Sequence, residues 1–171
     1  MEIEVFGADE QQAVAVDVLK WVRLARLVLA EERVPGEAEL SVIFVDEQSI
    51  TDLNERFLGH EGPTDVLAFP MDDDLVLGGR QPDQGGRGPG APSEPVDPPT
   101  VIGDVVICPA VAQRQAAAHR VALDDELALL VVHGVLHLLE YDHTEEEETQ
   151  RMKRREQELL DLFRKREIGR S

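Results

Sequence analysis

An apolar segment of helical length carries two histidines, His133 and His137, four residues apart. The flanking runs ELALLVV and VLHLL predict a buried helix from about Glu126 to Leu139. Side chains at this spacing point to the same helix face, about one turn apart. Because buried imidazoles need partners, the pair has the arrangement that chelates a metal ion.

A third histidine, His143, follows after a short polar turn that can bring it back over the same face. Three neutral imidazoles leave the fourth tetrahedral position of a zinc ion open for water, as in catalytic rather than structural zinc sites. The stretch HGVLHLLEYDH therefore predicts one Zn²⁺ per chain and a zinc-dependent hydrolase. The alternative is that the histidines are core side chains with partners from the protein.

Length and composition restrict the class of protein. The 171 residues fit one compact domain, and the single cysteine, Cys108, cannot form an internal disulfide. No apolar run reaches the roughly 18 residues of a membrane span and no leader is evident, so we expect a soluble cytoplasmic protein without a membrane partner.

The charge is large and unevenly distributed. A formal net charge of −18 argues against indiscriminate binding of nucleic acid, whose phosphates are bound mainly by Lys and Arg. Residues 151–171 nevertheless carry eight Lys or Arg against four acidic residues. This basic segment is either a local docking patch or a solvated helix stabilised by ion pairs one turn apart.

Hydrophobic periodicity predicts alternating strands and helices. The chain opens with the strand EIEVF, a helix from Asp9 to Glu32 with Asp9 as N-cap, and an interior strand, LSVIFV. The further predicted elements are helices at 46–57, 109–119 and 145–165, the last with Thr144 as N-cap, and strands at 66–69 and 101–108. Residues 72–99 are rich in Gly and Pro and predict a flexible inserted loop, to which we assign no chemistry.

The stretch HGVLHLLEYDH closely resembles the hallmark HGxLHLxGYDH of the YbeY family of bacterial endoribonucleases, the rRNA maturation factors. Three further stretches occur in the family's order: SVIFVD at 41–46, GPTDVLAFPMD at 62–72 and IGDVVICP at 102–109. The resemblance thus covers most of the chain, apart from the insert and the two ends.

The resemblance implies a single α+β domain over residues 1–171. It implies a mixed four-stranded β-sheet with about five surrounding α-helices, and the helix of the histidine motif buried against the sheet. It also implies zinc bound by His133, His137 and His143, single-stranded RNA as substrate, and a role in rRNA processing with ribosomal or ribosome-assembly proteins as partners.

Three positions depart from the family pattern. Glu140 replaces a glycine in the turn before His143, and Ala68 replaces a serine. Leu58 stands where family members commonly have an arginine, a natural clamp for a scissile phosphate. Arg56 and His60 lie nearby, but Arg56 falls nearly on the opposite helix face and His60 is only partly charged near neutral pH, so we expect neither to replace the arginine fully.

The predicted chemistry begins from a metal-activated water. This water attacks a phosphodiester, or the metal polarises the phosphate while the 2′-hydroxyl of the RNA attacks. Asp142, next to the third histidine, and Asp104 are candidates for orienting the ligands or for acid–base work. Thr64 and Asp65 are assigned a substrate-facing catalytic role through the family-like stretch that contains them.

Two other functions fit parts of the pattern. Metalloproteases share the spacing HxxxHxxxxxH, but they have a glutamate as general base after the first histidine, where this chain has Gly134. A non-catalytic, zinc-containing ribosome-assembly module is the other alternative, favoured by the absent arginine and the acidic composition and opposed by the open zinc position.

Overall fold

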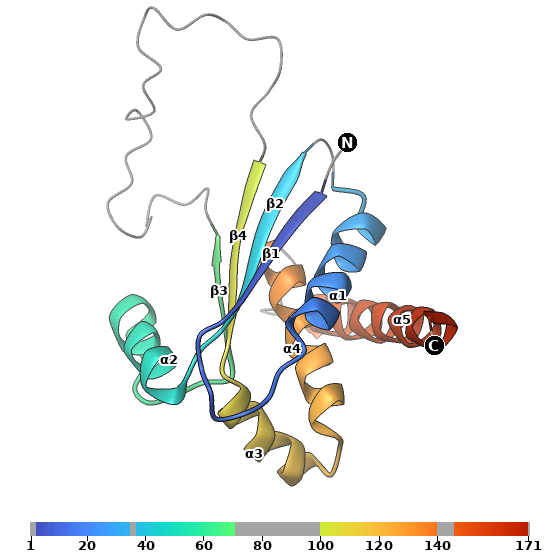
Figure 1. The fold of residues 1–171 in the computed structure, drawn as a ribbon. Coiled ribbons are helices and arrows are strands. Elements are labelled where there is room, and N and C mark those ends of the chain that lie inside the picture. Colours follow the sequence, from blue (N-terminus) through green and yellow to red (C-terminus); the bar gives the residue numbers. More distant parts are fainter. Residues whose placement is uncertain (1–2, 35–36, 71–99, 140–145, 171) are drawn as a thin grey trace, which may run out of the picture.

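The computed structural model describes residues 3–34, 37–70, 100–139 and 146–170. Figure 1 shows four strands in one sheet with helices on both of its faces. In chain order the elements are β1 (Ile3–Asp9), α1 (Val18–Glu31), β2 (Ala38–Phe44), α2 (Glu47–Leu53) with a π-helical turn η1 (Asn54–Leu58), β3 (Val66–Pro70), β4 (Thr100–Ile107), α3 (Pro109–His119), α4 (Leu123–Leu138) and α5 (Glu146–Arg170).

The sheet is mixed and has the strand order β1-β2-β4-β3. Strands β1, β2 and β4 are parallel, whereas β3 pairs with β4 in the antiparallel direction. The continuous apolar runs of β2 and β4 lie in the two interior positions, as expected for strands covered on both faces. The prediction of a single α+β domain with a mixed four-stranded sheet and five surrounding helices is therefore confirmed.

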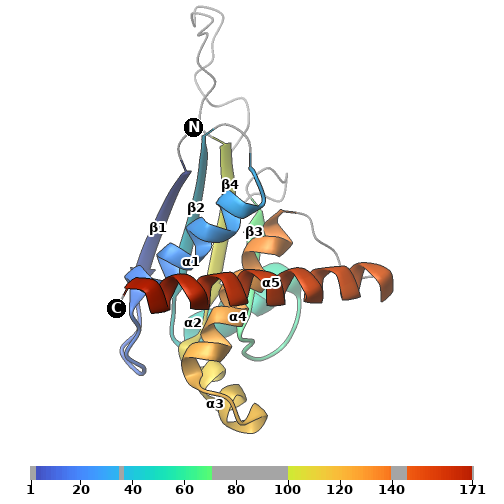
Figure 2. The ribbon, with the colours of Figure 1, turned by 90° about the vertical axis from the view of Figure 1, so that its right-hand side faces the viewer.

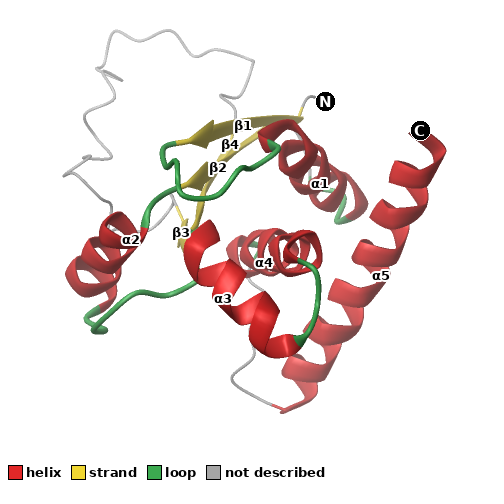
Figure 3. Ribbon diagram, turned by 60° about the horizontal axis from the view of Figure 1, so that its bottom comes forward, coloured by secondary structure: helices red, strands yellow, loops and turns green. Residues whose placement is uncertain are grey.

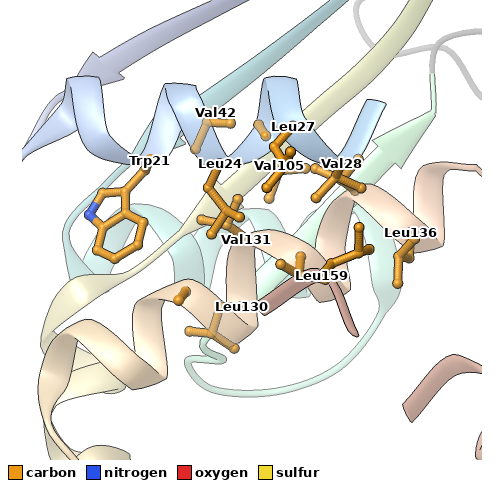
Figure 4. Close-up of a cluster of buried hydrophobic side chains, with 14 of the residues drawn as sticks. Trp21, Leu24, Leu27, Val28, Val42, Val105, Leu130, Val131, Leu136 and Leu159 are labelled. Carbon is orange, nitrogen blue, oxygen red and sulfur yellow. The ribbon is translucent and has the colours of Figure 1, made fainter. Parts of the chain in front are cut away.

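The larger hydrophobic core lies between the sheet and helices α1, α4 and α5. Figure 4 shows Trp21 and Leu24 of α1, Val131 of α4 and Val105 of β4 in this core cluster, and all four residues are at most 1% exposed. On the opposite face of the sheet, α2 covers a smaller cluster. That second cluster contains Val45, Ile50, Leu67, Phe69, Val106, Cys108 and Val111.

The start of α1 differs from the prediction. Asp9 is the last residue of β1, and the N-cap is Asp17, whose carboxylate accepts a hydrogen bond from the Lys20 amide. Between them, the Gln11 side chain donates to the Val14 carbonyl and accepts from the Val14 amide. This local pairing satisfies backbone groups that a helix would otherwise use, so the intervening residues form an irregular connection.

Helix α4 lies at the centre of the helical layer. It packs against the sheet through β3 and β4 and against α1, α3 and α5, as Figure 3 shows. In Figure 2, α5 crosses α4 and α1 on the side away from the sheet. The prediction of a buried histidine-motif helix is confirmed, although α4 begins at Leu123. No helix within the four described ranges is both long and apolar enough to cross a membrane.

Helix α4 approaches the sheet closely at Gly134. A Cβ atom built on this glycine would lie 2.6 Å from Cγ1 of Val105 on β4. That distance is too short for a real contact, so the absence of a side chain at this position allows the helix to sit directly on the strand.

Gly134→Ala is expected to lower the free energy of unfolding by about 1 to 3 kcal/mol, because the methyl group overpacks the contact with Val105. Gly169→Ala is the matched control, since a Cβ there meets nothing within 4 Å and the residue is also helical. Urea unfolding of both variants checks this prediction. Equal stability of the Gly134 variant and the unaltered chain would show that α4 has room to shift.

Candidate metal centre

The two histidines of α4 lie side by side. The rings of His133 and His137 have centroids 5.1 Å apart and meet edge to face at 68°. The His133 side chain is 33% exposed, so it combines a packed helix position with access from outside. The spacing of four residues thus brings the two imidazoles together as expected.

A carboxylate from another helix orients His133. Oε2 of Glu156 on α5 lies 2.7 Å from Nδ1 of His133, and the Glu156 side chain is only 9% exposed. With Nδ1 as the donor to this carboxylate, the lone pair of a neutral ring is on Nε2, the form that binds metal ions. The arrangement matches the carboxylate–histidine pairs that support metal ligands.

The described residues contain only part of the predicted ligand set. His143 and Asp142, like Glu140, lie outside the described residues, so the structure does not place them. Among residues that are described, no group of three or more His, Cys, Asp or Glu side chains is arranged to hold a metal ion. The structure therefore contributes two of the three predicted ligands and the carboxylate that orients one of them.

A cavity of about 540 Å³ begins at His133 and follows one face of α4. Its walls come from α3, from α5 and from the residues around the start of β3. The lining residues are Asp65, Val66, Gln115, His119, Glu126, Leu129, Leu130, His133, Thr149, Met152, Lys153 and Glu156.

At the other end of this cavity, hydrogen bonds connect several polar side chains to one another. The Gln115 amide nitrogen, in the side-chain orientation that satisfies its neighbours, donates to Oδ2 of Asp65 at 2.8 Å and to Oε2 of Glu126 at 3.3 Å. The other Glu126 oxygen lies 3.3 Å from Nδ1 of His119. Glu126 is 4% exposed, so these partners compensate the burial of its carboxylate.

Comparison with known proteins identifies the family. The family described as Endoribonuclease YbeY matches residues 7–164. This chain belongs to the endoribonuclease YbeY family.

Several relatives with that name align over nearly the whole chain. The protein from Frankia casuarinae is 45% identical over 91% of this chain and 72% of its own length, and that from Thermobifida fusca is 43% identical over 91% of each. The protein from Salinispora tropica is 44% identical over 96% of this chain and 97% of its own. The solution structure of TM1509 from Thermotoga maritima shares the fold, with a TM-score of 0.54 and 24% identity over 95% of this chain and 93% of that one.

The Thr64–Asp65 pair lies just before β3. The Asp65 backbone carbonyl accepts a hydrogen bond from the Cys108 amide at 3.0 Å, which fixes the pair next to the end of β4. The Thr64 hydroxyl is 3.4 Å from Oδ1 of Asp65. Of the two, only Asp65 lines the cavity that begins at His133.

The position of the usual YbeY arginine is exposed. Leu58 ends the π-helical turn η1 and is 48% exposed. Neither Arg56 nor His60 lines the cavity beside His133, whereas Lys153 of α5 does. Among the described residues, Lys153 is therefore the Lys or Arg side chain that lines this cavity.

Several basic residues of the C-terminal helix α5 form ion pairs. Arg155 donates to Glu32 and Glu158, and Arg164 donates to Asp161. These contacts agree with the interpretation of residues 151–171 as a solvated helix held by ion pairs. They also fasten α5 to α1 through the Arg155–Glu32 pair.

Several polar residues of the site were not predicted. Glu156 and Glu126 carry buried carboxylates on otherwise apolar helix faces, and Gln115 and His119 of α3 contact Glu126. The sequence did contain a sign of these residues, because Glu156 shares one helix face with the apolar Met152 and Leu159.

Asp104 does not lie at the histidine site. Val105 faces Gly134 of α4, and neighbouring strand residues alternate between faces, so Asp104 points to the other side of the sheet. Burial raises the pKa of its carboxyl, and a hydrogen bond with Ser41 opposes this shift. The suggested role of Asp104 in orienting the histidines or in acid–base chemistry is wrong for this arrangement.

Asp104→Asn is expected to stabilise the protein relative to the unaltered chain more at pH 7 than at pH 3. The raised pKa means that the folded state favours the protonated carboxyl, so its contribution to stability is lost as the pH rises through that pKa. The asparagine does not ionise. Thermal unfolding of both proteins across this pH range measures the difference, and a difference that is constant with pH would contradict the account.

Proposed function

We propose that this chain is a zinc-dependent, single-strand-specific endoribonuclease that acts in ribosomal RNA maturation in the cytoplasm. The proposed zinc ligands are His133, His137 and His143. The observation that carries the proposal is the adjacent pair of α4 imidazoles, of which His133 is held by the buried Glu156 carboxylate and lines a cavity. The names of the YbeY relatives support the reaction class.

The donor set fits a borderline divalent cation. Imidazole nitrogens suit zinc, and a carboxylate on the remote ring nitrogen raises their basicity. When bound, zinc would supply a Lewis acid that polarises a phosphodiester and activates water. Nickel, copper and iron also bind imidazoles, so metal analysis identifies the ion.

The chain's own residues supply orientation and charge. Glu156 fixes the ring of His133, and Lys153 offers a positive charge beside the cavity for a phosphate of the RNA. Asp65 faces the substrate from the opposite wall, with Thr64 beside it. In this proposal Asp142 supports the neighbouring ligand or transfers a proton.

A non-catalytic zinc module for ribosome assembly is the second candidate. The observation that favours it is the exposed Leu58 in place of the YbeY arginine. A metalloprotease is disfavoured further, because the glutamate that it requires at position 134 has no space against Val105.

His137→Ala is expected to remove bound zinc and to reduce cleavage of single-stranded RNA by about 100-fold or more, because one ligand of three is lost. The control is His60→Ala, a histidine outside the cavity, which should retain one zinc per chain. Metal analysis and an RNA-cleavage assay on each purified protein provide the measurements. Zinc without cleavage in the unaltered chain would favour the assembly module, and full cleavage by the His137 variant would refute the proposed site.

Glu156→Gln is expected to weaken zinc binding by about 10- to 100-fold, since an amide holds the His133 ring less firmly and lowers its basicity. Glu158→Gln, on the exposed side of the same helix, should leave the affinity unchanged. Competition with a chromogenic chelator measures both affinities. Equal zinc affinity of the two variants would show that Glu156 has only a packing role.

A further inference from the structure

The cavity beside His133 combines an apolar surface with an acceptor-rich wall. Val66, Leu129, Leu130 and Met152 supply the apolar part. Its volume of about 540 Å³ lies within the roughly 300–1,000 Å³ of small-molecule sites. An apolar surface of this kind suits a flat ring better than a hydrated ion.

The polar wall presents mainly hydrogen-bond acceptors. Asp65 and Glu126 both contribute carboxylates, and the Gln115 amide nitrogen between them is already engaged by both. The remaining polar atom of Gln115 is its carbonyl oxygen, another acceptor. A ligand group that contacts Asp65 or Glu126 must therefore bring hydrogen-bond donors, and an anionic group is disfavoured at this wall, whereas Lys153 lines the cavity from α5.

Of the two carboxylates, Asp65 is the more accessible. Glu126 has a side chain only 6% exposed, and its two oxygens are engaged by His119 and Gln115. Asp65 is only partly buried, and each of its oxygens has a second lone pair beyond the contacts with Thr64 and Gln115. Its carboxylate can accept two parallel hydrogen bonds from one ligand edge.

We propose that this cavity is a nucleobase subsite that selects guanine through the Asp65 carboxylate. The inference rests on the proposed function, which makes single-stranded RNA the substrate. Guanine presents adjacent N1–H and N2–H donors that match one carboxylate, and hydrogen bonds to a charged acceptor are the strong ones. Uracil has a single ring N–H flanked by two carbonyls, which the acceptor wall repels.

The subsite adjoins the proposed reaction centre. His133 and Asp65 line the same cavity, so in this proposal a base held by Asp65 belongs to a nucleotide near the phosphate at the histidine pair. Lys153 lies on the same wall as Glu156 and can contact that backbone. The subsite thereby determines which bond of the strand reaches the metal ligands.

Binding of fluorescent hexaribonucleotides tests the subsite without cleavage. In the presence of EDTA, an oligouridine with one central guanosine is expected to bind at least about tenfold more tightly than oligouridine itself. Replacing that guanosine by inosine, which lacks the 2-amino group, should remove most of the gain without any change in the protein. Equal affinity for the guanosine, inosine and all-uridine strands would overturn the subsite.

Asp65→Asn tests the same assignment from the protein side. The backbone hydrogen bond from Cys108 to the Asp65 carbonyl is unaffected, and the guanosine advantage should fall to about twofold or less. The matched control, Asp161→Asn, removes an exposed carboxylate of α5 away from the cavity and should keep the full advantage. A guanosine preference that survives in the Asp65 variant would overturn the role of this carboxylate.

Cleavage of a mixed-sequence RNA separates this inference from the proposed function. Cutting next to guanosine supports both, and cutting without a base preference overturns the subsite while the nuclease stands. If the protein cuts no RNA but still prefers the guanosine strand through Asp65, the nuclease proposal fails and the subsite remains.

Discussion

A hydrogen bond between His133 and the buried carboxylate of Glu156 links the two helices on which the candidate site depends. It joins α4, which rests on the sheet at Gly134, to α5, which crosses it from the other side. A carboxylate that is 9% exposed is costly without a partner, so the pair constrains both the packing of α5 and the tautomer of the imidazole. Fold and chemistry are therefore coupled at one contact.

The elements that the sequence could predict are those with strong local patterns. The apolar runs of β2, β4 and α4 and the helix start at Pro109 are set by the residues themselves, and the structure has them as expected. The start of α1 was missed because the side chain of Gln11 organises the chain after Asp9, while Asp17 provides the actual cap. Asp9 and Asp17 are nearly equivalent as N-cap residues, and contacts of this kind decide between them. The hydrophobic periodicity of the sequence gives no information on such contacts.

The candidate site likewise has a part that the sequence predicts and a part that it does not. Spacing on one helix was enough to bring His133 and His137 together, because four residues make about one turn. The carboxylate that contacts His133 comes from elsewhere, since Glu156 lies 23 residues further along the chain. In the cavity wall, Gln115 and Asp65 meet only after β3 and α3 are in place. Asp104 was wrongly expected at the site. Side chains along β4 alternate between the two faces of the sheet, and Asp104 points to the face away from α4. Tertiary contacts of this kind can be identified only when the fold is known.

X-ray absorption spectroscopy at the zinc edge of the zinc-loaded protein tests the central claim most directly. The account predicts three imidazole nitrogens at about 2.0 to 2.1 Å and one oxygen ligand from solvent. A fourth ligand from the protein, or a zinc ion without histidine neighbours, would contradict an oriented histidine site that keeps one position open for catalysis.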